Sequence, residues 1–192
     1  KACYIPIGHT FKGCINRDIV LNKLKPMLED VSIKKIGQNI KFDFIIFHKY
    51  GIKISSMEDT MLMSYVLDAG KNRHNMDILS EIHLGHKTIS FKEIVGTGKK
   101  EINFSEVEVD KAKDYAAEDA DVTFRLYKKF LKNLKSEKII NIYEIFEKPL
   151  IKILAFMEIE GVEIDSKFLN SLSQKFNKKI LTLEKEIYKI SK

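Results

Sequence analysis

The sequence predicts an α/β fold in which short strands alternate with amphipathic helices. Two short apolar runs, residues 2–7 and 32–36, have the length of strands and end next to a glycine. The longer segments repeat their apolar residues every three or four positions, as helices do. A hydrophobic fraction of 44% in 192 residues supports a packed core. Because fewer strands are visible than a full sheet needs, we expect a small sheet flanked by helices.

The N-terminal part of the chain is expected to contain two of these strand–helix passages after a first helix. In order, the pattern predicts a helix at 16–28 interrupted near Pro26, a strand at 32–36, a helix from Asn39 to Tyr50, a strand at 53–55 and a helix from 59 to 67. Asn39 has the chemistry of a helix cap, and Gly51 is a natural helix end.

The C-terminal part is expected to be mainly helical. The pattern predicts a helix at 78–84 that starts at Asn75 or Asp77 and is closed by Gly85, a turn at 91–95, a long helix at 109–134, helical pieces at 139–146 and 150–160 broken at Pro149, an extended piece at 161–164, and a last helix capped by Asp165. The change in character places a domain boundary near residues 136–148.

The long helix expected at 109–134 carries the first candidate site. Its apolar residues form one buried stripe, and Asp119 lies inside that stripe. A buried carboxylate is costly unless a cation or hydrogen-bond donors replace its lost water. Tyr115 is one turn earlier, so its hydroxyl can lie over the same turn. The pair indicates either a metal site with an oriented water, or a core Asp that pairs with a Lys beside a packing Tyr.

Asp43 is a second candidate, because it follows a predicted strand end and lies in the first turn of a helix. Polar groups at strand ends often face the ligand crevice of an α/β sheet. Taken alone, Asp43 is better explained as an acidic residue that favours the positive end of a helix.

Composition gives weaker indications. The net charge of +6 comes mainly from lysines, which are usually spread over a surface, so it is a weak sign of a nucleic-acid partner. Cys3 and Cys14 lack metal-ligand spacing and fit a reducing cytoplasm. The chain has no apolar run of the ~20 residues that would cross a membrane. Because it starts with Lys1 and not Met, we expect a fragment of a longer protein.

Several motifs occur in order and at a recognisable spacing. They are Asn39-x3-Asp43, Asp59-Thr60-Met61-Leu62, Arg73-His74-x2-Asp77-x-Leu79, Tyr115-Ala116-Ala117-Glu118-Asp119-Ala120-Asp121, and then Glu147-x-Pro149-Leu150 and Glu158-x2-Gly161-Val162-x-Ile164-Asp165. Together they resemble the 3′–5′ proofreading exonuclease domain of bacterial, family A DNA polymerases, of the ribonuclease-H-like DnaQ type, followed by the join into the polymerase domain.

The resemblance implies a ribonuclease-H-like mixed sheet flanked by helices that lacks its first strand, followed by an α-helical C-terminal segment. Residues 1–138 would be the exonuclease-like domain, and residues 139–192 would be the start of the polymerase domain with its first thumb helix. The implied reaction is hydrolysis of phosphodiester bonds at a single-stranded DNA 3′ end with two divalent ions, Mg²⁺ or Mn²⁺. The intact protein would also bind a primer-template and serve DNA replication and repair.

Motif by motif, the resemblance assigns roles to residues. Asp43 would hold one ion, Asp119 the other, and Tyr115 would orient the attacking water. Residues that would handle the single-stranded 3′ end are Gln38, Asn39, Arg73 and Phe91. Arginine suits a phosphate and phenylalanine suits base stacking, although Phe91 could equally be a core residue. Phe42 stands where many relatives carry Tyr.

One motif of the family is missing from this chain. The Asp-x-Glu pair of the first motif has no counterpart in residues 1–36. We therefore expect the ion site of this chain to be empty or partly filled, and its activity to be slight or absent. Two other functions stay open: a non-catalytic scaffold for the polymerase, and a ribonuclease-D-like RNA exonuclease. The retained Asp43, Tyr115 and Asp119 count against the scaffold, and the tail after residue 144 counts against the RNA enzyme.

The last helix has an unpartnered apolar side. Its large apolar residues follow spacings of three and four and form one seam, made by Leu169, Leu172, Phe176, Ile180, Leu183, Ile187 and Ile190. We expect this seam to pair with the same helix of a second copy or to fray; the alternative is that it folds back on residues 139–160.

Overall fold

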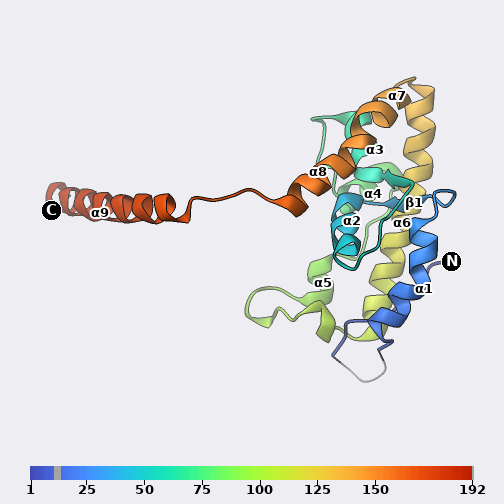
Figure 1. Cartoon of the computed structure of the whole chain (residues 1–192), viewed down its shortest axis with the longest axis horizontal. Coiled ribbons are helices and arrows are strands. Elements are labelled where there is room, and N and C mark those ends of the chain that lie inside the picture. The colour runs from blue at the N-terminus through green and yellow to red at the C-terminus, as the bar shows by residue number, and fades with distance from the viewer. Residues whose placement is uncertain (11–13, 192) are drawn as a thin grey trace. The chain divides into compact units, whose positions relative to one another are not determined.

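The computed structural model describes residues 1–10 and 14–191, and it divides into two compact units. The first unit runs from Lys1 to Ile159 and the second from Glu160 to Lys192 (Figure 1). The domain boundary predicted near residues 136–148 rests on sequence character and stays a prediction, because the two units are defined by packing alone.

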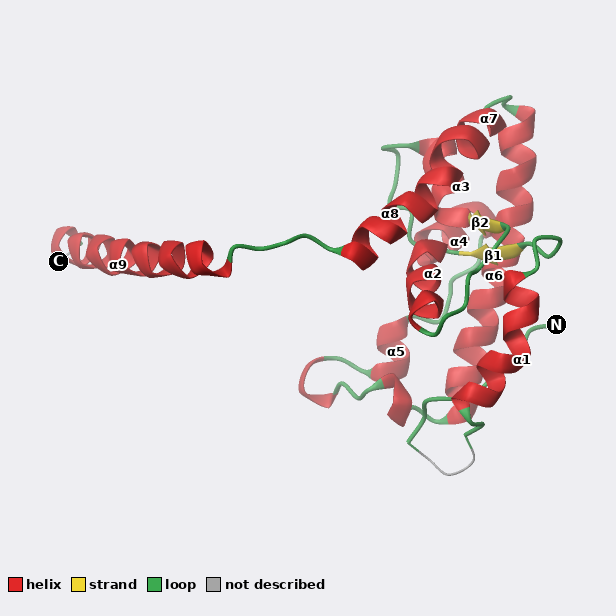
Figure 2. Ribbon diagram, in the orientation of Figure 1, coloured by secondary structure: helices red, strands yellow, loops and turns green. Residues whose placement is uncertain are grey.

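A two-stranded parallel sheet lies inside the first unit. Strand β1 (Lys35–Gly37) pairs with β2 (Met57–Asp59), with Lys35 opposite Met57 and Gly37 opposite Asp59. Figure 2 shows these two short strands surrounded by helices. The helix α2 (Ile40–Lys49) lies between them in sequence, as a parallel crossover requires. The fold is thus mainly helical with a small parallel sheet, which is compatible with the predicted α/β class.

Both strands lie a few residues later in the chain than predicted, and the strand expected at 2–7 is absent. Strand boundaries depend on the register with a partner, which local sequence does not encode. Residues 2–7 have no ladder partner among the described residues. Instead, the carbonyl of Pro6 accepts a hydrogen bond from Ile15 N, and just after this segment Thr10 N donates to Ser105 O.

The first helix, α1 (Arg17–Glu29), is continuous through Pro26, so the predicted interruption is wrong. Pro26 lies in the last turn, where its missing N–H removes one hydrogen bond and its carbonyl still accepts from Asp30 N. At the other end the Asn16 side chain accepts from Asp18 N and Ile19 N and caps the helix.

The main core lies between the long helix α6 (Val109–Ser136) and the helices α3 (Thr60–Asp68) and α4 (Met76–Leu84). The predicted stripe of α6 is confirmed. Its members Ala112, Thr123, Leu126, Phe130 and Leu134 are buried. The core cluster itself is made by Val122, Leu126, Tyr127, Phe130, Leu134, Met63, Leu79 and Tyr143. Gly85 closes α4 in the left-handed conformation at φ 62°, as predicted.

Past α6 the chain stays helical through α7 (Ile140–Ile142), the π-helical turn η3 (Tyr143–Glu147) and α8 (Lys148–Glu160). The predicted break at Pro149 does not occur, because Pro149 follows directly on the π-helical turn η3 and the chain stays helical through it. Ile151 and Ala155 of α8 pack with Ile40 and Phe44 of α2 in a second core cluster.

A third cluster lies around the short helix α5 (Phe91–Val95), which begins where a helical turn was predicted, and the 3₁₀ turns η1 (Gly98–Lys100) and η2 (Phe104–Glu106). Val95, Val107 and Ala112 are buried there, with Tyr4 and Phe104 packed against them.

The second unit is dominated by α9 (Ser166–Ile190). The predicted cap is confirmed, since Asp165 Oδ1 accepts from Phe168 N at 2.9 Å. No residue within the described part of α9 is buried, so its apolar seam is open to solvent. Across residues 1–10 and 14–191, the helices are all too short or too polar to cross a membrane.

Candidate active-site groove

A groove of about 600 Å³ in the first unit brings together both predicted metal-binding aspartates. Asp43 reaches it from the first turn of α2, and Asp119 reaches it from the middle of α6. The end of β1 forms one wall. The groove is lined by Lys34, Ile36, Gly37, Gln38, Asp43, Met76, Asp119, Ala120, Thr123 and Phe124. Residues far apart in sequence thus share one surface because α6 packs against β1.

Asp119 is a half-buried carboxylate whose charge is poorly compensated. Its Oδ1 atom is buried and has no hydrogen-bond partner among the described residues. Burial raises the pKa of Asp119 to about 6; a hydrogen bond from Tyr115 opposes this shift, and the nearby charges of Asp77 and Glu118 add to it. The alternative of a core Asp paired with a Lys is not what the geometry shows, because Asp119 forms no ion pair with a lysine within the described residues.

Tyr115 lies beside Asp119, as the one-turn spacing predicts. Burial raises the pKa of the Tyr115 hydroxyl to about 12, with further contributions from the charge and the hydrogen bond of Asp119. The phenol therefore keeps its proton at neutral pH and can donate a hydrogen bond. Its ring belongs to an aromatic cluster, with centroids 6.1 Å from Phe91 and 6.1 Å from Phe104.

Asp43 is more exposed than Asp119, yet its environment also disfavours its charge. Partial loss of water raises the pKa of the Asp43 carboxyl, its own backbone N–H opposes this shift, and the charge of Asp59 adds to it. The position in the first turn of α2 fits the simpler explanation of an acidic residue at a helix N-terminus. The same carboxylate also lines the groove that Asp119 lines.

Gln38 and Asn39 lie next to Asp43 but face different hollows. Gln38 lines the groove, and its Nε2 donates to His74 O at 2.8 Å. Asn39 lines a smaller apolar hollow of about 210 Å³, together with Met61 and Leu150. Asn39 does not cap α2 with its side chain as predicted; it adopts the left-handed conformation, φ 57°, and the cap comes from Asp59.

Phe91 and Arg73 lie outside the groove. Phe91 is 49% exposed and stacks on Phe104 at 6.0 Å, so it is neither a core residue nor isolated, and Tyr115 links it to Asp119. Arg73 is exposed in the turn that precedes α4. Of the seven predicted site residues, the groove itself thus contains Asp43, Asp119 and Gln38.

Sequence reasoning missed the residues that support the site. Glu118 accepts from His86 Nε2 at 2.8 Å and from Ile89 N at 2.6 Å, which ties the loop before α5 to α6. Asp77 accepts from the Thr88 hydroxyl at 2.6 Å and lies near Asp119. Glu118 and Asp77 both sit inside motifs, which was the available signal, but their partners lie 11 to 32 residues away and nothing local indicates them.

The donor chemistry fits a divalent cation in part. Carboxylate oxygens are the ligands that Mg²⁺ and Mn²⁺ prefer, and the orphaned Oδ1 of Asp119 is a place where a cation would remove an electrostatic cost. Within residues 1–10 and 14–191, however, no group of three or more potential ligand side chains is close enough to hold an ion. Asp43 and Asp119 would therefore supply an incomplete ligand set.

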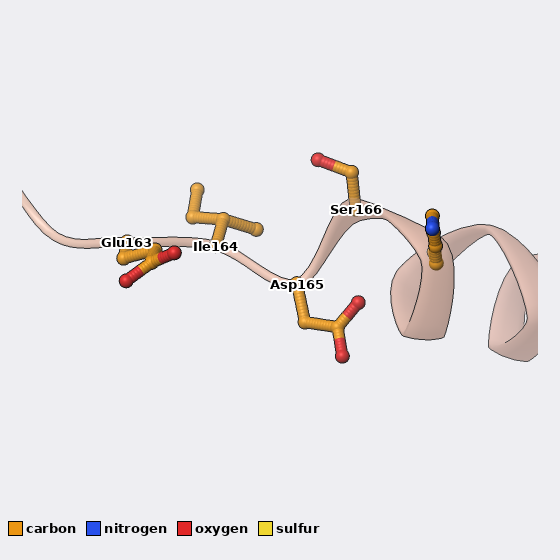
Figure 3. A pocket seen from close by; sticks show the side chains of 5 residues that line it. Glu163, Ile164, Asp165 and Ser166 are labelled. Atoms are coloured by element: carbon orange, nitrogen blue, oxygen red, sulfur yellow. The ribbon is translucent and has the colours of Figure 1, made fainter.

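Another concavity, in the C-terminal unit, has no such chemistry. It is an open hollow of about 580 Å³ around residues 163–167. Figure 3 shows that the Asp165 and Ser166 side chains point to opposite sides of the chain there. Asp165 is already used as the cap of α9, so no set of groups converges on a ligand.

The comparisons agree with the motif resemblance. A DNA polymerase I of Rhizobium leguminosarum is 44% identical over 98% of this chain and 20% of its own length, and one of Pseudomonas aeruginosa is 37% identical over 100% and 22%. This chain thus spans about a fifth of these relatives. A solved structure, the "POL domain of Pol1 from M. smegmatis complex with DNA primer-template and dNTP", shares the fold with a TM-score of 0.68 at 18% identity, over 88% of this chain and 26% of that one. A family model described as 3′–5′ exonuclease matches residues 1–135, and the chain therefore belongs to the 3′–5′ exonuclease family.

Proposed function

We propose that this chain is the 3′–5′ exonuclease part of a DNA polymerase I, and that its groove hydrolyses phosphodiester bonds at a single-stranded DNA 3′ end. The observation that carries the proposal is the meeting of Asp43 and Asp119 in one groove, with Tyr115 beside Asp119. Family membership and the names of the relatives support it.

The proposal gives each residue a task. Asp43 and Asp119 would hold divalent ions, Mg²⁺ or Mn²⁺, and such ions lower the pKa of an attacking water and stabilise the leaving oxygen. Tyr115, whose hydroxyl is protonated at neutral pH and whose pKa burial raises further, to about 12, orients a water by hydrogen bonding. The half-buried Asp119 carboxylate fixes the position of that hydroxyl through their shared hydrogen bond.

The 3′ end would be held by residues around the groove. Gln38 and Asn39 present amides, Arg73 presents a guanidinium for a phosphate, and Phe91 presents a half-exposed ring on which a base can stack. In the same proposal, β1 and β2 are two strands of a ribonuclease-H-like sheet whose first strand is missing from this chain. Residues 1–138 form the exonuclease domain and residues 139–192 begin the polymerase domain.

We further propose that the 192 residues alone have little or no exonuclease activity. Asp43 and Asp119 are only two of the carboxylates that the resemblance requires, and an incomplete ligand set binds ions weakly. Robust Mg²⁺-dependent 3′–5′ degradation of single-stranded DNA by this chain, abolished by Asp119→Ala, would contradict this point. An arm with an RNA oligonucleotide tests the RNA-exonuclease alternative.

The proposed activity is tested in a longer polypeptide that contains this chain and an Asp-x-Glu strand. There, Asp43→Ala should lower the exonuclease rate by orders of magnitude, because it removes an ion ligand. Polymerisation on a primer-template should survive, because it would rest on a separate domain. Asp121→Ala, an exposed position on α6, is the matched control and should leave both rates unchanged. Equal loss of both activities in Asp43→Ala would overturn the assignment.

A further inference from the structure

The Asp59-Thr60 pair has a place in the motif pattern but no task in the reaction described so far. It lies at the end of β2, where the register sets Asp59 directly opposite Gly37 at the end of β1. Both residues are almost fully enclosed, with exposed fractions of 1% for Asp59 and 0% for Thr60. Neither can therefore touch a nucleic acid directly, and any contribution passes through the residues that they contact.

The Asp59 carboxylate is held by backbone N–H groups from two chain segments. Its Oδ1 accepts from Asn39 N at 3.0 Å and from Met61 N at 2.8 Å, and its Oδ2 accepts from Ile40 N at 3.0 Å. Burial raises the pKa of this carboxyl, and these backbone donors oppose the shift. One side chain thus caps both α2 and α3, and it holds Asn39 in the left-handed conformation that a non-glycine residue rarely adopts.

Thr60 does the same for the preceding residue. Its hydroxyl proton is shared between Gln38 Oε1 and Gly37 O, the latter at 3.1 Å. The other end of the Gln38 amide is held as well, because Nε2 donates to His74 O at 2.8 Å. The Gln38 side chain is therefore fixed at both ends, in a groove where a free glutamine would otherwise sample many rotamers.

We infer that Asp59 and Thr60 are positioning residues that pre-organise Gln38, Asn39 and the first turn of α2 for the DNA 3′ end. The inference rests on the proposed function, because it assigns the fixed amides to that ligand. Asp59 holds the main chain at Asn39 and Ile40, three residues before Asp43, and Thr60 holds the side chain of Gln38. Pre-organised groups bind more tightly because less freedom is lost on binding.

The test compares Thr60→Val with Thr60→Ser in the 192-residue chain. Valine keeps the shape but removes the hydroxyl, whereas serine keeps it. Ser55→Ala is the control: it removes a hydroxyl that donates to the Glu29 carbonyl at 2.8 Å, at the opposite end of β2 from Asp59. Three quantities are measured for each variant: resistance to urea, affinity for a fluorescent single-stranded oligodeoxynucleotide, and the NMR signals of the Gln38 side-chain amide.

We expect Thr60→Val to weaken oligonucleotide binding about fivefold, the loss of roughly one hydrogen bond, and to shift and broaden the Gln38 amide signals. Thr60→Ser should restore both. Ser55→Ala should lower the resistance to urea while leaving the affinity unchanged, which separates positioning from stability.

The two proposals fail in different ways. Gln38 signals that are unchanged in Thr60→Val overturn the positioning inference whether or not DNA binds. So does wild-type affinity in Thr60→Val, or an equal loss of affinity in Ser55→Ala. A wild-type chain that binds no oligonucleotide overturns the DNA ligand of the proposed function, while a Gln38 signal that shifts only in Thr60→Val still supports the fixing of that side chain by Thr60.

Discussion

The environment of Asp119 favours the neutral, protonated form of its carboxyl group over the charged form. In the metal-free chain its pKa of about 6 lies above the value of an unfolded Asp, so the folded state favours the protonated carboxyl. The stabilising effect of protonation is complete below the unfolded pKa and is lost as the pH rises through about 6. Without metal, Asp119 should therefore make the chain more resistant to urea in mild acid than above neutral pH.

Asp119→Asn should remove that dependence. In EDTA at about pH 8 the variant should be more stable than the wild type by about 1 kcal/mol, after allowance for partial solvent screening, and at about pH 4 the two should be equal. Urea unfolding at the two pH values measures this difference. Asp121→Asn, at an exposed position of the same helix, is the control, and its stability relative to the wild type should not change between the two pH values. A constant difference between wild type and Asp119→Asn at both pH values would contradict the assignment.

At the scale of elements, the π-helical turn η3 is fastened to the sheet by one hydroxyl. Tyr143 OH accepts from Asp59 N at 2.9 Å and donates to Glu58 Oε2 at 3.0 Å, and Glu58 Oε1 accepts from Lys148 Nζ at 2.9 Å. Tyr143 and Glu58 are both buried. Removing one partner of a buried hydrogen bond is costly, because the donor or acceptor that remains is shielded from water and stays unsatisfied.

Tyr143→Phe should therefore lower the free energy of unfolding by about 1–3 kcal/mol, although it removes a single oxygen atom. The cause is the loss of a partner for the Asp59 N–H and for Glu58 Oε2. Urea denaturation followed by circular dichroism measures the change. Tyr65→Phe, at a residue that is 48% exposed, is the control. A loss in Tyr143→Phe no larger than in Tyr65→Phe would show that the fastening contributes little.

Local contacts were predictable from the sequence and distant ones were not. Tyr115 and Asp119 meet because four residues make one turn of α6, and Gly85 closes α4 through its own backbone. The strand expected at 2–7 failed because a strand needs a partner, and the cap expected from Asn39 failed because Asp59, 20 residues later, takes that role. The shared groove of Asp43 and Asp119 followed from the motif resemblance, since no local rule relates residues 76 positions apart.

At the scale of the whole molecule, the apolar seam of α9 is a candidate surface for self-association. Exposed apolar side chains along this helix forgo about 1.5–3 kcal/mol each relative to burial, and none of its described residues is buried. We propose that two copies pair through α9. Light scattering at high concentration should show a dimer, and Leu172→Glu with Ile180→Glu should return it to a monomer. A strict monomer with a well-ordered α9 would refute the pairing, and Lys175→Glu with Lys179→Glu serves as a control for added charge.

A carboxylate that caps two helices also couples their dynamics. Because Asp59 bonds to the first turn of α2 and the first turn of α3 at once, neither turn can fray without releasing its share of the same buried charge. The two helices should therefore open as one cooperative unit, with the amides of Ile40 and Met61 reporting a single opening free energy in native-state hydrogen exchange. The first turn of α2, which carries Asp43, would then open only together with the first turn of α3.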